Sequence, residues 1–318
     1  MNIFLTGATG FIGKALLEEL LKRNNKVIVA VRHGVTTFSE DVSQAKINDL
    51  FELENAQMMQ GVNTVIHCAA RAHVLNENLA DSLVAFQNTN TSGTLTLAKQ
   101  AVAAGVKRFV FISSIGVLGK TNNHAFSESD MPNPRGPYAI SKYEAELALQ
   151  ALAKRTDLEV VIIRPPLVYG PNVPGNFALL MHWMHKNIPL PFGSIHNKRS
   201  FVALDNLVDL LILCTNHPAA ANEVFLVADG EDFSTTELLK RVSKALGKKS
   251  RLFPFNQKLL EFCLKCVGKK ELVQRLCGSL QVDNSKAKKL LNWTPPISVD
   301  EGLHKMADDF LKTHTKLI

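Results

Sequence analysis

Residues 2–13 read NIFLTGATGFIG, an apolar run followed by glycines at positions 7, 10 and 13. The run Ile3 to Leu5 predicts a short buried strand. Glycines allow a tight turn and the close approach of a pyrophosphate, and a helix that starts there offers free N–H groups. Leu16, Leu17, Leu20 and Leu21 give the following helix one apolar face. The stretch therefore predicts a strand, turn and helix that bind a dinucleotide.

The end of the second strand bears on the choice of cofactor. Residues 26–31 (KVIVAV) predict this strand, and Arg32 and His33 follow it with no acidic residue before Glu40. An acidic residue at this place binds the ribose 2′-hydroxyl of NAD, whereas a cation suits the 2′-phosphate of NADP. We therefore expect NADP(H), with NAD(H) as the alternative.

Apolar strands and helical stretches alternate through the first half of the chain. Further strands are predicted at 64–67, 109–113 and 159–164, with helices at about 78–104 and 138–155. This alternation is typical of an α/β fold with a doubly wound parallel sheet, a Rossmann domain. Prolines from residue 165 onward mark loops around one helix at about 176–186, and the remainder after a strand at 224–227 is mostly helical. We expect the Rossmann domain to comprise 1–164 plus about 195–229. A smaller, mostly helical substrate domain would comprise about 165–194 plus 230–318.

Tyr138 and Lys142 are four residues apart in a predicted helix, so their side chains share one face. A free tyrosine has a pKa of about 10 and is a poor base at neutral pH. A neighbouring ammonium favours the phenolate and makes proton exchange with a hydroxyl or carbonyl feasible. The spacing alone is weak evidence. It gains weight from the glycine-rich turn and from the pair Ser113-Ser114, which ends an apolar strand.

Length and composition set the class of protein. The 318 residues are enough for about two domains. No secretory leader or membrane-spanning run is evident, so we expect a cytoplasmic protein. Five cysteines without a framework spacing fit reduced thiols. Cys263 and Cys266 form a lone C-x-x-C pair in a helical run, which we interpret as buried helix thiols. Neither they nor His182 and His185 have a further ligand in view, and we expect no metal site.

Positive charge is concentrated at the C-terminal end. Residues 236–318 hold 17 Lys and Arg against 8 Asp and Glu, whereas the whole chain has a net charge of +7. Solvated helix faces would explain this. A surface that attracts an anionic substrate or an acidic membrane is the sharper interpretation. We expect no nucleic-acid binding, because no basic-aromatic binding motif is present.

Taken together, the motifs resemble those of the extended short-chain dehydrogenase/reductases, in particular the NAD-dependent epimerase/dehydratase family. The resemblance covers essentially the whole chain. Its carriers are TGATGFIG at 6–13, N-x-x-G-T at 90–94, Ser113-Ser114 with V-x-G at 117–119, and Y-x-x-x-K at 138–142. Further carriers are RP at 164–165, VYGP at 168–171, R-x-FV at 199–202, DNLV at 205–208, W-x-P at 293–295 and EGL at 301–303. The nearest subgroup comprises UDP-glucose 4-epimerase-like proteins of bacterial polysaccharide clusters, including reductases of UDP-4-keto-6-deoxy-N-acetylhexosamines.

The resemblance implies a role for each matching residue. Ser114, Tyr138 and Lys142 would be catalytic, with Tyr138 as acid/base at the sugar C4 oxygen and Ser114 hydrogen-bonded to the same oxygen. Ser114, Asn176 and Arg199 would bind the UDP-sugar, and a guanidinium fork independently suits phosphate. The residues implied in cofactor binding are Gly7, Thr9, Gly10, Phe11, Ile12, Gly13, Arg32, Asp49, Leu50, Ala69, Ala70, Asn90, Ser113, Tyr138, Lys142 and Pro165.

Two departures from the family pattern bear on the reaction. Dehydratases of the family carry an Asp-Glu pair directly after the active-site hydroxyl residue. Here Ile115 and Gly116 follow Ser114, and neither can move a proton. Leu167 stands where the family commonly has an asparagine that contacts substrate. The first departure argues against a 4,6-dehydratase, and the second weakens a generic galactose epimerase.

We therefore expect an NAD(P)-dependent oxidoreductase that transfers hydride at C4 of a nucleotide sugar. The leading interpretation is reduction of a UDP-4-keto-6-deoxy-N-acetylhexosamine for surface polysaccharide synthesis. The alternative is a 4-epimerase of UDP-glucose or UDP-N-acetylglucosamine with tightly bound NAD.

Two lesser alternatives remain. A small-ketone reductase would not need Arg199 or be inhibited by UDP. A non-catalytic NAD(P) sensor could dispense with the tyrosine, which this chain keeps. The resemblance also implies a homodimer through helices at about 79–104 and 138–155, although packing of their apolar faces against the chain's own core is equally consistent.

Overall fold

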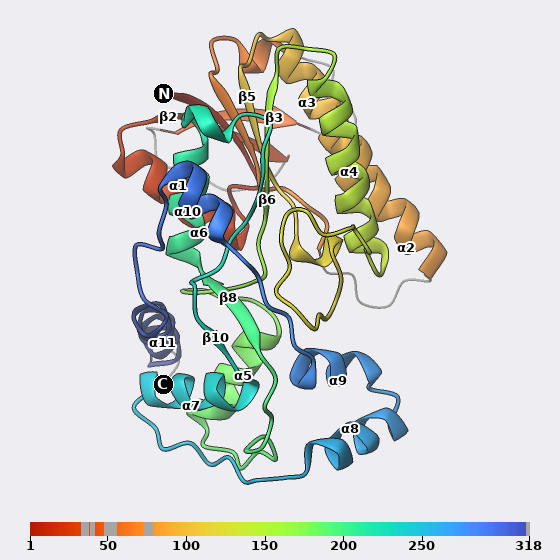
Figure 1. The fold of residues 1–318 in the computed structure, drawn as a ribbon. Coiled ribbons are helices and arrows are strands. Elements are labelled where there is room, and N and C mark those ends of the chain that lie inside the picture. The colour runs from red at the N-terminus through yellow and green to blue at the C-terminus, as the bar shows by residue number, and fades with distance from the viewer. Residues whose placement is uncertain (33–37, 39–41, 48–55, 73–78, 316–318) are drawn as a thin grey trace.

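The computed structural model describes residues 1–32, 38, 42–47, 56–72 and 79–315. A large parallel sheet with helices on both faces forms one part of the molecule, and a smaller, mostly helical part lies below it in Figure 1. This arrangement confirms the predicted fold class. No described helix is long and apolar enough to cross a membrane.

The sheet has seven strands in the order β3-β2-β1-β4-β5-β6-β9, and every neighbouring pair is parallel. The strands are β1 (Asn2–Thr6), β2 (Lys26–Arg32), β3 (Ser43–Ile47), β4 (Thr64–His67), β5 (Arg108–Ile112), β6 (Glu159–Arg164) and β9 (Val224–Leu226). From β1 the chain builds outward first to β2 and β3, and then in the opposite direction from β4. The carboxyl ends of β1 and β4 therefore flank the point where a doubly wound sheet binds its ligand.

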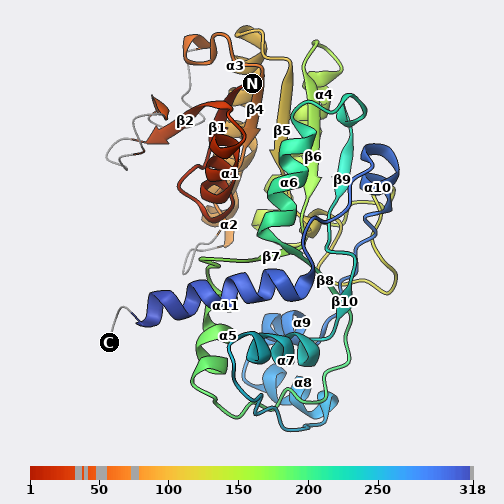
Figure 2. The same cartoon turned by 90° about the vertical axis from the view of Figure 1, so that its left-hand side faces the viewer.

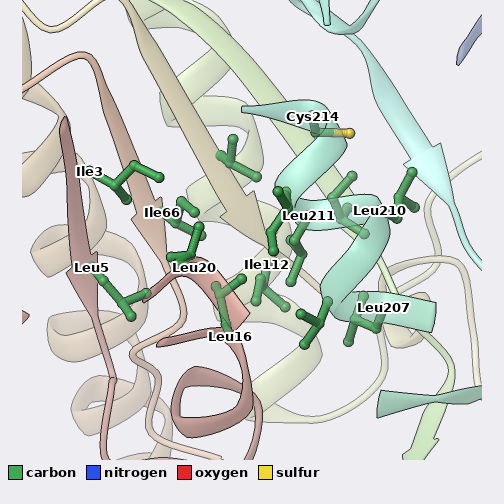
Figure 3. Packing of buried hydrophobic residues seen from close by; sticks show 14 of the residues in the cluster. Ile3, Leu5, Leu16, Leu20, Ile66, Ile112, Leu207, Leu210, Leu211 and Cys214 are labelled. Carbon is green, nitrogen blue, oxygen red and sulfur yellow. The ribbon is translucent and has the colours of Figure 1, made fainter. Parts of the chain in front are cut away.

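Each face of the sheet carries its own core. Helices α1 (Phe11–Lys22) and α6 (Leu204–Cys214) lie to the left of the sheet in Figure 1, and α3 (Gly93–Ala103) and α4 (Pro137–Ala153) lie to its right. Because side chains alternate along a strand, Ile3 and Leu5 pack toward α1 and α6, whereas Phe4 packs toward α3 and α4. Figure 3 shows the first of these cores, where Leu16 and Leu20 meet Leu207 and Leu211.

The smaller part is built around a second, three-stranded sheet. Its strands are β7 (Leu167–Tyr169), β8 (Arg199–Ala203) and β10 (Asp232–Phe233), in the order β10-β8-β7. Its helices are α5 (Asn176–His185), α7 (Thr235–Ala245), α8 (Gln257–Cys266), α9 (Lys270–Cys277) and α11 (Val299–Thr315) (Figure 2). Phe201 of β8 packs in the core of this part, whereas Val202 packs against the large sheet. Helix α10 (Ser285–Leu291) also joins the large sheet, through Ala287 and Leu291. The strand β8 thus belongs to the interface of both parts.

One predicted helix is interrupted. Of the stretch expected at about 78–104, residues 79–103 are helical, but they divide into α2 (Leu79–Phe86), a π-helical segment (Gln87–Ser92) and α3. A π-helical turn inserts one extra residue and is frequent at functional sites. Asn90 lies in this segment. Strand β3, a polar edge strand, was not predicted.

Candidate active site

The glycine-rich turn connects β1 to α1 in a conformation that larger residues would disturb. Gly7 has a φ of +72°, and a Cβ placed there would lie 2.6 Å from the backbone nitrogen of Ala69. A Cβ on Gly13 would lie 2.0 Å from the carbonyl oxygen of Gly7. Gly10 caps α1 without a side-chain hydrogen bond, so the first N–H groups of the helix are left for another acceptor. A diphosphate is the acceptor that this geometry suits.

Polar and small residues follow the carboxyl ends of β4, β5 and β6, at the same edge of the sheet as the glycine turn. Ala69 is half-buried and Ala70 exposed directly after β4. The side chain of Ser113, at the end of β5, is 2% exposed, and no described residue hydrogen-bonds its hydroxyl. Pro165 is buried after β6, and its carbonyl accepts a hydrogen bond from the N–H of Ile115 at 2.9 Å. A buried hydroxyl with no protein partner marks a place where a ligand group would complete the hydrogen bonding.

Tyr138 and Lys142 project from the first two turns of α4. The ring of Tyr138 meets the ring of Phe86 edge-on, with 6.2 Å between centroids, and the surrounding protein raises its pKa to about 12. The side chain of Lys142 is buried, with Nζ 4.2 Å from the centroid of the Phe111 ring. Burial lowers the pKa of Lys142 to about 7, although the carboxylate of Glu146 acts in the opposite direction. A polar ligand at this place would restore the solvation that the ammonium loses.

Ser114 approaches the same helix from β5. It is half-buried and caps the short 3₁₀ turn Ile115–Val117, where its Oγ accepts a hydrogen bond from the N–H of Gly116 at 3.1 Å. A Cβ on Gly116 would lie 3.6 Å from the Cβ of Ala139, so this turn packs directly on the start of α4. The fold therefore holds the Ser114 hydroxyl beside the helix turn that carries Tyr138.

Asn90 ties the π-helical segment to its surroundings. Its Oδ1 accepts from the N–H of Arg71 at 2.8 Å, and its Nδ2 donates to the carbonyl of Arg71 at 3.1 Å and to Ser141 Oγ at 3.0 Å. Ser141 Oγ in turn donates to the carbonyl of Tyr138 at 2.9 Å. Asn90, which the resemblance placed among the cofactor-binding residues, thus contacts the backbone after β4 and the catalytic helix.

The same hydrogen-bond network continues through a fully buried histidine that the sequence analysis missed. His67 Nε2 lies 2.9 Å from Thr94 Oγ1, and Nδ1 lies 2.6 Å from Thr6 Oγ1. Thr94 Oγ1 donates to the carbonyl of Asn90 at 2.6 Å, so it accepts from His67 Nε2–H. His67 Nδ1 then accepts from Thr6, and Thr6 Oγ1 accepts from the N–H of Ala69. Each hydrogen of these groups therefore has an acceptor. Through Asn90 and Ser141, the hydrogen-bond network extends from β1 to the carbonyl of Tyr138.

A buried ion pair lies one turn beyond Lys142. Arg164 donates through Nε and a terminal nitrogen to the two carboxylate oxygens of Glu146, at 3.0 and 2.6 Å. Both side chains are buried. The carboxylate is thereby fixed near Lys142, and Arg164 compensates its charge. Its spacing of four from Lys142 is a sequence signal that could have identified Glu146.

The remaining predicted site residues are less clearly placed. Arg32 ends β2 and is exposed. Arg199 begins β8 and donates to the carbonyls of Arg275 and Gly278 at 3.2 and 3.1 Å, so one of its nitrogens is engaged at the end of α9. Asn176 is the first residue of α5, but its side chain lies outside the described residues, as do Asp49 and Leu50.

One prediction about residues outside the candidate active site was wrong. We expected Cys263 and Cys266 to be buried, but both are exposed on α8. Apolar residues occupy nearly every position from 259 to 267, so the sequence pattern does not distinguish the covered face of this helix from the open one. Within the described residues, no group of three His, Cys, Asp or Glu side chains could hold a metal ion.

The described groups fit a nicotinamide dinucleotide. The glycine turn and the free end of α1 suit its pyrophosphate, and the unpartnered Ser113 hydroxyl and the buried Lys142 lie farther along the same edge of the sheet. The Tyr138 hydroxyl can exchange a proton with an oxygen on a carbon that exchanges hydride, and the Ser114 hydroxyl can hydrogen-bond to the same oxygen.

Comparisons with known proteins agree with this geometry. The model of the NAD dependent epimerase/dehydratase family matches residues 3–228. A Vibrio cholerae protein named UDP-glucose 4-epimerase is 44% identical over 99% of this chain and 97% of its own length. The Thermotoga maritima UDP-glucose 4-epimerase, solved with UDP-glucose, is 25% identical with a TM-score of 0.77, over 99% of this chain and 100% of the other. MoeE5, solved with UDP-glucose and NAD, is 25% identical with a TM-score of 0.78, over the full length of both chains. The chain belongs to the NAD-dependent epimerase/dehydratase family, whose motifs it carries from the glycine turn to Tyr138 and Lys142.

Proposed function

We propose that the protein is a UDP-hexose 4-epimerase that works with a retained NAD. The observation that carries this proposal is the placement of Tyr138 and Lys142 on α4 and of Ser114 before the turn that packs on α4, at the same edge of the sheet as the glycine turn. The similarity to the Vibrio cholerae protein supports the epimerase over the reductase that the sequence analysis favoured. The Thermotoga maritima enzyme and MoeE5, both solved with UDP-glucose, support a UDP-sugar substrate.

A nicotinamide dinucleotide held by the glycine turn, Ser113 and Lys142 would supply reversible hydride exchange at C4 of the sugar. Tyr138 takes the proton of the C4 hydroxyl as the hydride leaves, and gives it back when the C4 ketone is reduced from its other face. Lys142 in its ammonium form would stabilise the phenolate of Tyr138, against the burial that raises the pKa of Tyr138. Ser114 Oγ stabilises the C4 oxygen by a hydrogen bond as its charge changes. The Arg199 nitrogens not bound to carbonyls would contact the diphosphate, which turns the sugar toward Tyr138.

The decisive experiment is a nucleotide analysis followed by an activity assay. We expect denatured protein to release NAD, and the native protein to interconvert UDP-glucose and UDP-galactose, or their N-acetylated forms, without added cofactor. Protein that releases no nucleotide and converts no UDP-hexose would contradict the proposal.

A 4-reductase is the second candidate, and two observations favour it. Leu167, at the position where an asparagine is common, is 50% exposed in β7, and Arg32 is an exposed cation at the end of β2. An empty cofactor site, preferential binding of NADPH over NADH, and NADPH oxidation only with a UDP-4-keto sugar would support this function. We expect Arg32→Asp to reduce such an NADPH preference.

We also propose a homodimer through α2 and α4. Val84 and Leu147 on these helices are 56% and 48% exposed. A monomer in light scattering over a wide concentration range would contradict it.

A further inference from the structure

The segment 247–270 joins α7 to α9 and includes α8. It holds seven Lys and Arg residues and one acidic residue, Glu261. In Figure 1 it runs along the lower margin of the molecule, in the part farthest from the N-terminus. We call this segment the basic edge. Neither the catalytic residues nor the glycine turn belong to it.

The basic edge exposes large apolar side chains. Phe253, Leu259, Phe262 and Val267 are 44%, 49%, 64% and 67% exposed. Exposed residues Leu259, Phe262, Cys263 and Cys266 are spaced by three or four along α8, so they share one face of the helix.

The opposite face of α8 is already used by the protein. Leu260 is buried in the core of the smaller part, and Leu264 packs against that core. Helix α8 therefore has two apolar faces, and the fold covers only one of them. Contiguous exposed apolar surface of this kind marks an interaction site more often than a solvated face.

We call the exposed face of Leu259, Phe262, Cys263 and Cys266 the apolar stripe. Cations lie around it, and few of them have an acidic partner. Lys258 and Lys265 are exposed on α8 beside it, and Lys248, Lys249, Arg251 and Lys269 are exposed before and after the helix. Among the described side chains of the basic edge, only Lys265 has an acidic partner within 4.0 Å, Glu261 at 3.9 Å.

These features favour an anionic lipid surface as the binding partner of the basic edge. An interfacial helix pairs Phe and Leu on one face with Lys and Arg around it, which is the pattern of α8. A second copy of this chain would bring two strongly positive edges together, so charge opposes self-association. The Leu, Phe and Cys side chains of the stripe can be buried in an apolar phase, but they offer no strong hydrogen-bond acceptors to a polar partner.

We propose that the basic edge docks the protein reversibly on anionic membranes. Phe262 and Leu259 enter the boundary between headgroups and acyl chains, while the lysines contact lipid phosphates. Docking is peripheral, because no described helix could span a bilayer. It also involves none of the catalytic residues. We therefore expect the enzyme to remain active on a soluble substrate without vesicles.

The test is flotation of the full-length protein, kept reduced, with vesicles of phosphatidylcholine alone or mixed with phosphatidylglycerol. We expect binding only to the anionic vesicles and its loss at high salt. Lys258→Glu with Lys265→Glu should lower the partition coefficient at least about tenfold. Leu259→Ser with Phe262→Ser should also release the protein, because it removes the inserted side chains.

The matched control lies on α10, which also exposes two lysines and a leucine. Lys288→Glu with Lys289→Glu, and separately Leu290→Ser, should leave vesicle binding unchanged. All variants should keep the wild-type circular dichroism and any activity measured without vesicles.

Three outcomes would overturn the proposal. The first is a wild-type protein that stays unbound with anionic vesicles, and the second is binding that the α8 and α10 variants reduce equally. The third is a wild-type dimer in light scattering that Leu259→Ser with Phe262→Ser converts to a monomer, because the stripe would then belong to a second copy.

Discussion

The candidate active site around α4 and the basic edge around α8 differ in the burial of their side chains and in whether polar groups have partners. Around α4, His67, Asn90 and Glu146 are buried, and each has hydrogen-bond partners. Around α8, Phe262 is 64% exposed and most described cations lack an acidic partner. In the first region polar groups bind one another within the protein, so substitutions there should change activity or stability. In the second region the side chains lack internal partners, so substitutions there should mainly change binding to the proposed membrane.

The largest effect should come from Tyr138→Phe, which removes the proton-transferring hydroxyl and keeps the ring against Phe86. General acid–base groups contribute about 10²–10⁴-fold, so we expect kcat to fall by that factor. Cofactor content, measured by release on denaturation, should stay at the wild-type level. Unchanged turnover would remove Tyr138 from the mechanism.

The contrast between buried and exposed groups can also be tested with two ion pairs, one beside Lys142 and one at the surface of α7. Glu146→Ala leaves the Arg164 guanidinium buried without its partner, and we expect a loss of about 3–5 kcal/mol in the free energy of unfolding. Glu231→Ala removes a partner from the surface cluster around Arg241, and this should cost about 0–1 kcal/mol. Denaturant titration measures both values, and equal losses would break the comparison.

The buried lysine predicts a pH dependence of stability in cofactor-free protein. In the folded state Lys142 loses its proton near pH 7, whereas in the unfolded chain it keeps it to about pH 10.4. The unfolded state therefore binds more protons between these values, and stability rises with pH across that window. We expect a gain of about 2 kcal/mol from pH 7 to pH 9 relative to Lys142→Met. Parallel stability curves for the two proteins would show that Lys142 keeps an ordinary pKa.

The smallest effect is expected on the exposed face of α8. Phe262→Ser should change the free energy of unfolding by less than about 0.5 kcal/mol in solution. Leu260→Ala, two residues away on the buried face, should cost about 2 kcal/mol or more. A loss at Phe262 as large as that at Leu260 would mean that the stripe is covered in the free protein.

Much of the large sheet could be predicted, because its signals are local. The run NIFLT with its glycines and the spacing of Tyr138 and Lys142 specify strand, turn and helix within a few residues. Strand β3 (SQAKI) was not predicted, because three of its five residues are exposed and it has no apolar run. The partners of His67 lie 61 and 27 residues away in the chain, and only the folded topology brings them together. For α8 the sequence predicted the helix but not which apolar face remains open.

The hydrogen-bond network through His67 also limits how protons can travel. The Asn90 carbonyl and the Ala69 N–H fix the direction of both hydroxyls, and burial lowers the pKa of His67 to about 3. The imidazole therefore stays neutral in one tautomer at physiological pH, and the network holds position without conducting charge. An epimerase needs no proton relay of this kind, because the proton that its base takes from the sugar is the proton that it returns. A reductase must import one proton per turnover and would need a separate route to solvent.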